Sequence, residues 1–318
     1  MRILDTAPGA KLLALGHYQP STVVTNDELS KTMDTSDEWI RSRVGIQERR
    51  VAGADESLED MAVHAGGKAL AASGLAASDI DLVIVATCTM ESPIPNAAAV
   101  VAHRLGIEAP GAFDVNAACA GFCYALATAD ASIRAGSARN VLVIGAEKLT
   151  QWLDWTDRST AVIFADGAGA AVVGPSDTPG IGPVVWGSAG DKADAIKIPD
   201  RTDHLRQEGQ TVFRWATTAL HPVAKQACER AGVDPSELSA FIPHQANLRI
   251  IEAIARRLGA DKAVVARDIV HAGNTSAASI PLALSRMLER GEVRSGGLAL
   301  VLGFGAGLTY AGQVIEIP

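Results

Sequence analysis

The stretch GLAASDIDLVIVAT (residues 74–87) is matched without a gap by GVDPSELSAFIPHQ (residues 232–245). Each copy has a glycine that can end a helix, a short polar turn, and then an apolar segment of strand length. The two copies are 158 residues apart, which is about half of the 318-residue chain. A repeat of this length predicts two similarly folded halves.

Two further matches occur at the same offset of 158 residues. NAACAGF (residues 116–122) corresponds to NTSAASI (residues 274–280), and VLVIG (residues 141–145) corresponds to ALVLG (residues 299–303). Each match alone would be weak, but three at one offset indicate an internal duplication.

Apolar strands and amphipathic helices alternate in both halves, which predicts an α/β fold. The near-continuous apolar runs are typical of strands buried on both faces. One helix is expected from Cys119 to Gly136, and another from about Ser276 to Gly291. We therefore expect two halves about a pseudo-twofold axis, divided into residues 1–174 and 175–318, with an irregular link over 175–209. The strands are predicted at 81–88, 111–115, 141–145, 169–174, 239–243, 263–267, 298–303 and 311–317.

Composition excludes several classes of protein. The net charge of −8 argues against nucleic acid as the main partner. The four cysteines fit no zinc spacing and are too few for a disulfide framework. No uncharged apolar stretch reaches the length of about 18 residues that a membrane span needs. We expect a protein of the reducing cytoplasm, without a metal site.

The duplication also suggests where chemistry occurs, because equivalent loops of two halves meet near the axis. Cys119 corresponds to Ala277, His244 to Ala86, and Asn274 to Asn116. One half therefore offers a thiol, and the other offers an imidazole and an amide. Each has an ordinary structural interpretation when taken alone: a buried cysteine, a satisfied core histidine, and an asparagine cap.

Cys119 is the best candidate for a nucleophile among the four thiols. It lies in AACAGF, where a strand and a turn lead into a helix. Backbone N–H groups and the helix dipole at such a position favour the thiolate, which predicts a lowered thiol pKa. The other three cysteines (Cys88, Cys123 and Cys228) are interpreted as packing residues. GFGAG (residues 303–307) follows the last long strand of the repeat and predicts a tight turn that could supply an oxyanion-hole N–H.

Six segments together resemble the β-ketoacyl-acyl carrier protein synthase III family of the thiolase superfamily. They are DTSDEWIRSRVGI, AACAGFCYALA, FADGAGAAVV, FIPHQANLRII, GNTSAASIPLAL and GFGAGLTYA, and they occur in the family's order between about residues 12 and 316. The resemblance implies a thiolase-like duplication with a layered α-β-α-β-α arrangement. It also implies an acyltransferase that joins an acyl-CoA primer to malonyl-acyl carrier protein by decarboxylative Claisen condensation.

The resemblance assigns roles to individual residues. Cys119 would be the nucleophile, with His244 and Asn274 completing the catalytic set, and the backbone N–H groups of Cys119 and Ala306 would form the oxyanion hole. Coenzyme A would bind Trp39, Arg43, Arg158, Gly209 and Asn247. Acyl carrier protein would dock on Arg214, Arg249, Arg256 and Arg257. On a helix beginning near residue 247, Arg249 and Arg256 share one face, opposite an apolar stripe. An ordinary solvated face remains the alternative.

Two departures from the family pattern concern the turn and the acyl pocket. Ala306 replaces a common glycine, but only its N–H is needed. Ile94 stands where the gate contributed by the partner of a homodimer often carries Phe, which suggests a roomier pocket for branched or longer primers. The 180–209 stretch also looks short for the family, so the sequence does not predict the shape of the pocket wall.

The expected chemistry has two steps and needs no metal or redox cofactor. Cys119 takes the acyl group from coenzyme A, and malonyl-acyl carrier protein then loses CO₂ to give the attacking carbanion. Decarboxylation removes the need for a strong base, so no Asp or Glu is expected in the set. The leading interpretation is initiation of type II fatty acid synthesis. The alternatives are a priming ketosynthase or acyltransferase of a polyketide pathway, a cysteine hydrolase of acyl thioesters, and a non-catalytic binder of acyl carrier protein.

Overall fold

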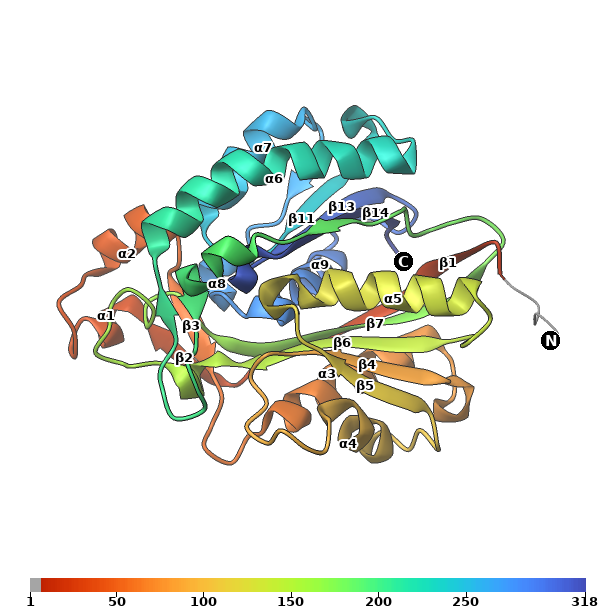
Figure 1. Cartoon of the computed structure of the whole chain (residues 1–318), viewed down its shortest axis with the longest axis horizontal. Helices are drawn as coiled ribbons and strands as arrows, with labels where there is room; N and C mark the ends of the chain where they lie inside the picture. The colour runs from red at the N-terminus through yellow and green to blue at the C-terminus, as the bar shows by residue number, and fades with distance from the viewer. Residues whose placement is uncertain (1–6) are drawn as a thin grey trace.

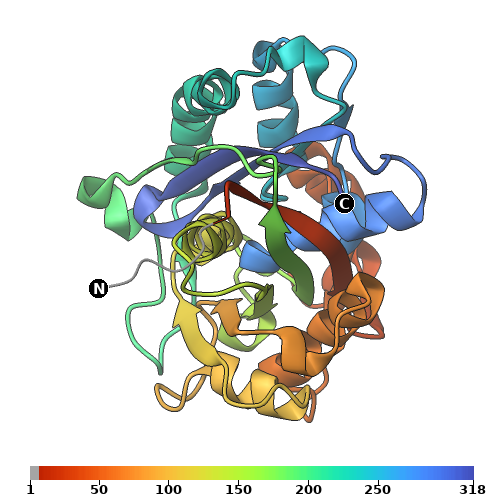
Figure 2. The same cartoon turned by 90° about the vertical axis from the view of Figure 1, so that its right-hand side faces the viewer.

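The computed structural model describes residues 7–318, which form five layers in the order helices, sheet, helices, sheet, helices (Figure 1). The outer layer on one side contains α3 (Leu58–Ser73) and α4 (Ala97–Arg104), and that on the other contains α6 (Gly209–Ala231) and α7 (Leu248–Leu258). The middle layer contains α5 (Gly121–Arg134) and α9 (Ser279–Glu289), and Figure 2 shows α5 end-on between the two sheets. The predicted α-β-α-β-α arrangement is confirmed.

The two sheets have the same topology. The first has the order β1-β7-β6-β4-β5 and the second β8-β14-β13-β11-β12, so each strand has a counterpart in the other half. In both sheets the last three strands are mutually parallel and the first two pair antiparallel. The strands of the first sheet are β1 (Gly9–Tyr18), β4 (Leu82–Ala86), β5 (Gly111–Val115), β6 (Val141–Lys148) and β7 (Asp166–Ser176). Those of the second are β8 (Val185–Gly187), β11 (Ala240–Pro243), β12 (Val264–Val265), β13 (Leu298–Phe304) and β14 (Tyr310–Glu316).

The eight predicted strands are all present, but two strands of the sheets were missed. β1 and β8 are edge strands that pair with the antiparallel strands β7 and β14. Neither falls inside the matched segments of the repeat. β8 has only three residues, and the apolar run at residues 12–15 of β1 was not assigned to a strand. The division at residue 174 stays a prediction.

Two short turns meet between the sheets. The 3₁₀ turns η2 (Ala118–Ala120) and η6 (Ser276–Ala278) contact each other, and each also contacts the central strand of the opposite half. Both contain a non-glycine residue with positive φ at equivalent positions, 45° at Ala118 and 48° at Ser276. Such backbone is uncommon outside glycine and tends to persist only where surrounding structure holds it. The shared strain shows that the duplication extends to the turns themselves.

Two equivalent glycines allow this close packing. A Cβ on Gly145 would lie 2.4 Å from the Ala277 carbonyl oxygen, and one on Gly303 would lie 2.9 Å from the Ala120 Cα. Each strand therefore touches the turn of the other half, as a pseudo-twofold axis requires.

The remaining segments lie around the ends of the sheets, most of them on the side of these turns, while η1 and η5 precede β4 and β11 at the other end. They include the β2–β3 hairpin (Thr22–Thr25 and Glu48–Val51), α1 (Asn26–Leu29), α2 (Asp37–Val44), α8 (Ile269–Ala272), η1 (Ala77–Asp79), η3 (Leu149–Trp152), η5 (Pro235–Glu237) and η7 (Ala306–Leu308). The predicted link over 175–209 is less irregular than expected. Besides β8 it contains η4 (Gly190–Ala195) and a small hairpin of β9 (Ile196–Lys197) and β10 (Arg206–Gln207).

Candidate active site

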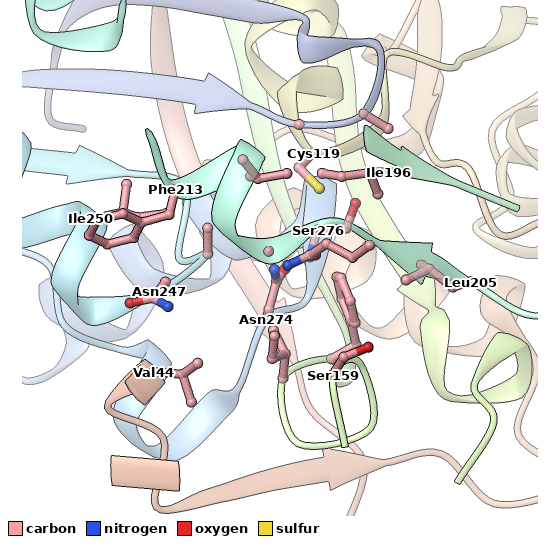
Figure 3. Close-up of a pocket in the computed structure, with 18 of the residues that line it drawn as sticks. Val44, Cys119, Ser159, Ile196, Leu205, Phe213, Asn247, Ile250, Asn274 and Ser276 are labelled. Carbon is pink, nitrogen blue, oxygen red and sulfur yellow. The ribbon is translucent and has the colours of Figure 1, made fainter. Parts of the chain in front are cut away.

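A cavity of about 990 Å³ opens where the two halves meet, and Cys119, His244 and Asn274 all line it. Cys119 comes from η2 of the first half, His244 follows β11, and Asn274 precedes η6 in the second half. Figure 3 shows Cys119, Asn274 and Ser276 grouped at one part of the cavity, with Phe213, Asn247 and Ile250 to one side and Leu205 to the other. The structure thus brings together three side chains that lie up to 155 residues apart in the sequence.

Cys119 is held tightly at the start of α5. A Cβ on Gly305 would lie 2.7 Å from the Cys119 Cβ and 3.0 Å from its sulfur, so only glycine leaves room for the thiol there. The sulfur lies within hydrogen-bonding reach of the Ser276 hydroxyl and of the backbone N–H groups of Cys119 and Ala306. The Ser276 proton is donated to Glu147, so this hydroxyl faces the thiol with a lone pair. Both N–H groups predicted for the oxyanion hole therefore face the reactive atom.

The predicted lowering of the thiol pKa is wrong for the cavity as it stands. Burial raises the pKa of the Cys119 thiol to about 12, and Glu147 adds to the rise, while the three hydrogen-bonding groups act in the opposite direction. The free energy lost by removing a thiolate from water exceeds the free energy gained from these hydrogen-bonding groups. Cys119 therefore rests as a neutral thiol, and its proton must leave when it attacks.

His244 is almost fully buried, and burial lowers its pKa to about 3. Its Nδ1 is 2.7 Å from the Ser279 Oγ, and the same oxygen accepts a hydrogen bond from the Gln245 N–H. Since the Ser279 hydroxyl already accepts that N–H, its own proton is available for Nδ1. In the tautomer in which Nδ1 accepts this proton, Nε2 carries the hydrogen of the neutral ring and is the donor available to a ligand.

The Asn274 side chain is fixed through one of its two polar atoms. Its Oδ1 accepts a hydrogen bond of 2.9 Å from the Ser276 N–H, and its backbone pairs with the Phe164 region. Asn116 makes the equivalent contact with the Ala118 N–H at 3.3 Å. The capping role considered for Asn274 is therefore real, and it leaves the amide NH₂ as a donor that lines the cavity.

All five residues predicted to bind coenzyme A line the outer part of the same cavity. The Arg158 guanidinium lies 5.1 Å from the centre of the Trp39 ring and donates a 2.7 Å hydrogen bond to the Asp34 carbonyl. The two side chains are in direct contact, so a ligand ring could stack between them only if they separated. Asn247 caps α7 and also donates to the Arg43 carbonyl at 3.2 Å. Gly209 is the first residue of α6.

The four arginines predicted to dock acyl carrier protein are exposed on α6 and α7 beside the cavity. Arg214 and Arg249 line the opening, and the Arg249 guanidinium lies 5.0 Å from the centre of the Phe213 ring. Arg257 donates to the Thr217 carbonyl at 2.7 Å and so ties α7 to α6. The predicted apolar stripe of α7, which includes Ile251 and Leu258, is buried on the opposite face.

Comparisons with known proteins agree with this geometry. Residues 113–190 match the family model described as 3-oxoacyl-[acyl-carrier-protein] synthase III, and residues 228–317 match the model of its C-terminal part. The chain is 56% identical over 313 residues to β-ketoacyl-[acyl-carrier-protein] synthase III 4 of Streptomyces coelicolor, covering 98% of this chain and 99% of that protein. The chain belongs to the β-ketoacyl-[acyl-carrier-protein] synthase III family. It is an acyltransferase-type condensing enzyme.

Solved structures of synthase III relatives share the whole fold. The priming β-ketosynthase of the R1128 polyketide biosynthetic pathway superposes with a TM-score of 0.96 at 44% identity, covering 100% of this chain and 98% of that one. The 3-oxoacyl-[acyl-carrier-protein] synthase III of Aquifex aeolicus VF5 superposes with a TM-score of 0.92 at 42% identity, covering 97% of this chain and 100% of that one. The predicted family and thiolase-like fold are thus confirmed.

Cys88 is placed differently from the expectation, whereas Ile94 is still predicted to act as a gate for a partner subunit. Ile94 is 79% exposed on the loop before α4 and does not line the cavity of its own subunit, so its gate role depends on a partner subunit. Cys88 is more than a packing residue, because it lines the cavity and its thiol donates to Glu147 at 3.3 Å. Cys123 and Cys228 are buried, as predicted. Over residues 7–318, no helix is long and apolar enough to cross a membrane.

Three polar residues near the site were missed: Glu147, Ser276 and Ser279. The repeat contained the signal, because at the 158-residue offset they face Gly305, Ala118 and Gly121. Each is a position where one half is polar and the other has a small residue, the same divergence that singled out Cys119 and His244.

Proposed function

We propose that this synthase III uses Cys119 to carry the acyl group of an acyl-CoA primer, and His244 and Asn274 to bind the malonyl thioester that condenses with it. The observation that supports this is the meeting of one thiol and two hydrogen-bond donors, from opposite halves, in one cavity. A reacting carbonyl placed there is within reach of a nucleophile and of groups that stabilise developing negative charge.

In the first step the Cys119 sulfur attacks the thioester carbonyl of acyl-CoA. The N–H groups of Cys119 and Ala306 already point at the sulfur, which places them next to the oxygen of an attacked carbonyl. Such preorganised donors typically contribute about 3–4 kcal/mol to the stabilisation of a tetrahedral intermediate. Collapse of the intermediate releases coenzyme A through the passage lined by Trp39 and Arg43.

In the second step malonyl-acyl carrier protein replaces coenzyme A. The neutral His244, donating from Nε2, and the Asn274 NH₂ hold the malonyl thioester oxygen while CO₂ leaves and enolate charge develops. The carbanion then attacks the acyl-cysteine and yields the β-ketoacyl thioester. A neutral imidazole suits this role, since the step calls for a donor and no proton has to be abstracted. The sequence of steps needs no metal or redox cofactor.

The pathway we propose is the initiation of type II fatty acid synthesis in the cytoplasm. Priming of a polyketide pathway is the second candidate, and the structural similarity to the R1128 priming β-ketosynthase favours it. Family membership makes the cysteine hydrolase the least favoured alternative, because synthase III enzymes join two acyl groups and do not hydrolyse a thioester. Acyl carrier protein would dock on the exposed arginines of α6 and α7, and the active unit would be a homodimer.

The test separates the two steps. Purified chain is incubated with acyl-CoA, and the acyl-enzyme is detected by mass spectrometry; malonyl-acyl carrier protein is then added, and CO₂ and the β-ketoacyl product are measured. Cys119→Ala should form no acyl-enzyme. His244→Ala and Asn274→Ala should acylate normally and lose condensation by 10²-fold or more, roughly the effect of removing one charge-stabilising donor.

Two results would contradict the proposal. Normal condensation by Cys119→Ala would exclude its role as the acyl carrier, and release of free acid from acyl-CoA without a condensed product would indicate a hydrolase. A panel of straight and branched acyl-CoA primers, run with the unmodified chain, then separates the candidate pathways by the primer that is preferred.

A further inference from the structure

Glu147, at the end of β6, is a buried carboxyl group that the two steps above leave without a role. It has no exposed surface, and no cationic side chain among residues 7–318 pairs with it. It accepts hydrogen bonds from the hydroxyls of Thr89 at 2.6 Å and Thr87 at 3.1 Å, from the Cys88 N–H, and from the Ser276 hydroxyl at 3.0 Å. Burying a carboxyl group without a cation is costly, so such a group calls for an explanation.

The Ser276 hydroxyl connects Glu147 to the reactive thiol. It donates to Glu147 Oε1 at 3.0 Å on one side and faces the Cys119 thiol on the other (Figure 3). Figure 3 shows Ser276 and Cys119 next to each other in the cavity. A hydroxyl carries one proton and two lone pairs, so it can accept a proton from the thiol while giving its own to the carboxylate.

The alternative acceptor, His244, is poorly suited to this task. Its ring is neutral, its pKa is about 3, and its Nδ1 is occupied by Ser279. The thiol, with a pKa of about 12, would have to lose its proton to a much weaker base. Burial instead raises the pKa of Glu147, which makes it a stronger base than an exposed carboxylate.

We propose that Glu147 takes the Cys119 proton through Ser276 during acylation and returns it after condensation. This relay rests on the proposed role of Cys119 as the acyl carrier. As the Cys119 sulfur bonds to the acyl carbon, its proton moves to Ser276 Oγ and the Ser276 proton moves to Glu147 Oε1. The bond between the acyl carbon and the coenzyme A sulfur breaks with its electron pair, and the released thiolate takes a proton from water.

The return of the proton completes the cycle. When the carbanion attacks the acyl-cysteine, the Cys119 sulfur leaves as a thiolate. Glu147 then gives its proton back through Ser276, which restores the neutral thiol and the carboxylate. CO₂ leaves as a neutral molecule, so the negative charge of the malonyl carboxylate passes to the carbanion, to the Cys119 thiolate and, with the return of the proton, to Glu147. Over one turnover that charge leaves on the coenzyme A thiolate, which takes one proton from water and leaves hydroxide, so atoms and charge balance.

Few titratable groups surround Glu147, which keeps its protonation simple to interpret. The thiols of Cys88, after β4, and Cys119, in η2, face it. Lys148, next along β6, turns away and donates to the carbonyls of Gly53 and Glu56. On the neighbouring strand β7 the residue opposite Glu147 is Gly167.

The experiment measures the acylation rate with acetyl-CoA between pH 5.5 and 9, by rapid quench and mass spectrometry of the intact chain. Glu147→Gln keeps the shape and an acceptor for the two threonines, but it cannot take a proton. Ser276→Ala removes the bridge, and Ala118 shows that alanine tolerates this backbone conformation in the other half. Asp166→Asn is the matched control: a buried carboxyl with a raised pKa that bonds Thr150 and Ala52 and has no link to Cys119.

In the unmodified chain the rate should level off once Glu147 is ionised. In both relay variants it should fall about a hundred-fold at neutral pH, the scale of general base catalysis, and rise tenfold per pH unit up to the highest pH tested. The control should keep the profile of the unmodified chain. A loss that is equal at every pH, or the same in Asp166→Asn, would overturn the relay. Absence of any acylation by the unmodified chain would instead refute the proposed function.

Discussion

At the scale of single residues, the site depends on which polar groups are kept neutral. His244 is buried and Cys119 is half-buried in the cavity, and in both the uncharged form is favoured. For His244 this means a fixed tautomer, with Ser279 holding Nδ1 and Nε2 left for the substrate. For Cys119 it means that the thiol stays neutral and weakly nucleophilic until a base takes its proton.

The buried His244 makes a prediction about stability and pH. Its pKa is about 3 in the fold and about 6.5 when unfolded, so between these values the unfolded chain binds more protons. The stability contribution is present above the unfolded pKa and is lost as the pH falls, by about 2 kcal/mol between pH 7 and pH 5. Thermal unfolding of His244→Ala should therefore depend less on pH over this range than that of the unmodified chain.

Asn274→Ala provides the control, because it removes a buried polar group that does not titrate. Its Tm should shift by the same amount at both pH values. Equal pH dependence in the unmodified chain and in His244→Ala would mean that His244 titrates normally in the fold.

At the scale of elements, α7 combines two functions on opposite faces. Its apolar face packs against α6 and the second sheet, and its exposed face carries Arg249, Arg256 and Arg257 beside the cavity opening. An acyl carrier protein with a negatively charged surface would be attracted to such a face.

Charge reversal at Arg256 and Arg257 tests this surface. The double change to Glu should raise the KM for malonyl-acyl carrier protein by about tenfold, since exposed charge pairs contribute up to about 1 kcal/mol each. Acylation by acyl-CoA should be unchanged, because neither side chain lines the cavity. Arg139→Glu, an exposed reversal between α5 and β6, serves as the control, and an equal effect there would indicate only a change in net charge.

Most strands could be predicted because strands buried on both faces appear in the sequence as apolar runs, whereas the layer order was implied by the family resemblance. β1 was missed although it contains such a run at residues 12–15, and β8 has only three residues. Cys119 and His244 differ between the halves, whereas Asn274 matches Asn116 and took its role from the resemblance. Glu147 was missed because its partners lie 58 to 129 residues away. The thiol pKa was wrong because burial is a property of the packed molecule, and local sequence shows only the helix start.

At the scale of the whole molecule, the surface near Ile94 stands out. Ile94 and Phe113 are large apolar side chains that are 79% and 37% exposed. We predict that this surface is covered in a homodimer and that Ile94 limits the partner's acyl pocket. Sedimentation should then give twice the chain mass of 33.0 kDa.

Ile94→Phe should narrow the pocket of the partner. We expect kcat/KM to fall at least about tenfold for branched or longer primers, the lower end of the effect of one methylene in an apolar pocket, with little change for acetyl-CoA. Trp186→Phe is the control, because Trp186 is 52% exposed on β8 and does not line the cavity. If Ile94→Phe leaves the primer preference unchanged, Ile94 does not line the acyl pocket of the partner.

The contact of η2 with η6 has a further consequence. Neither half contains a complete set of reactive groups, so the enzyme is active only when the two halves are packed together. A chain cut in the exposed segment around Asp177 should be inactive as separated fragments. Mixing the fragments should restore acylation at a rate that rises with their concentration. The acylation rate would then measure how much of the two fragments has assembled.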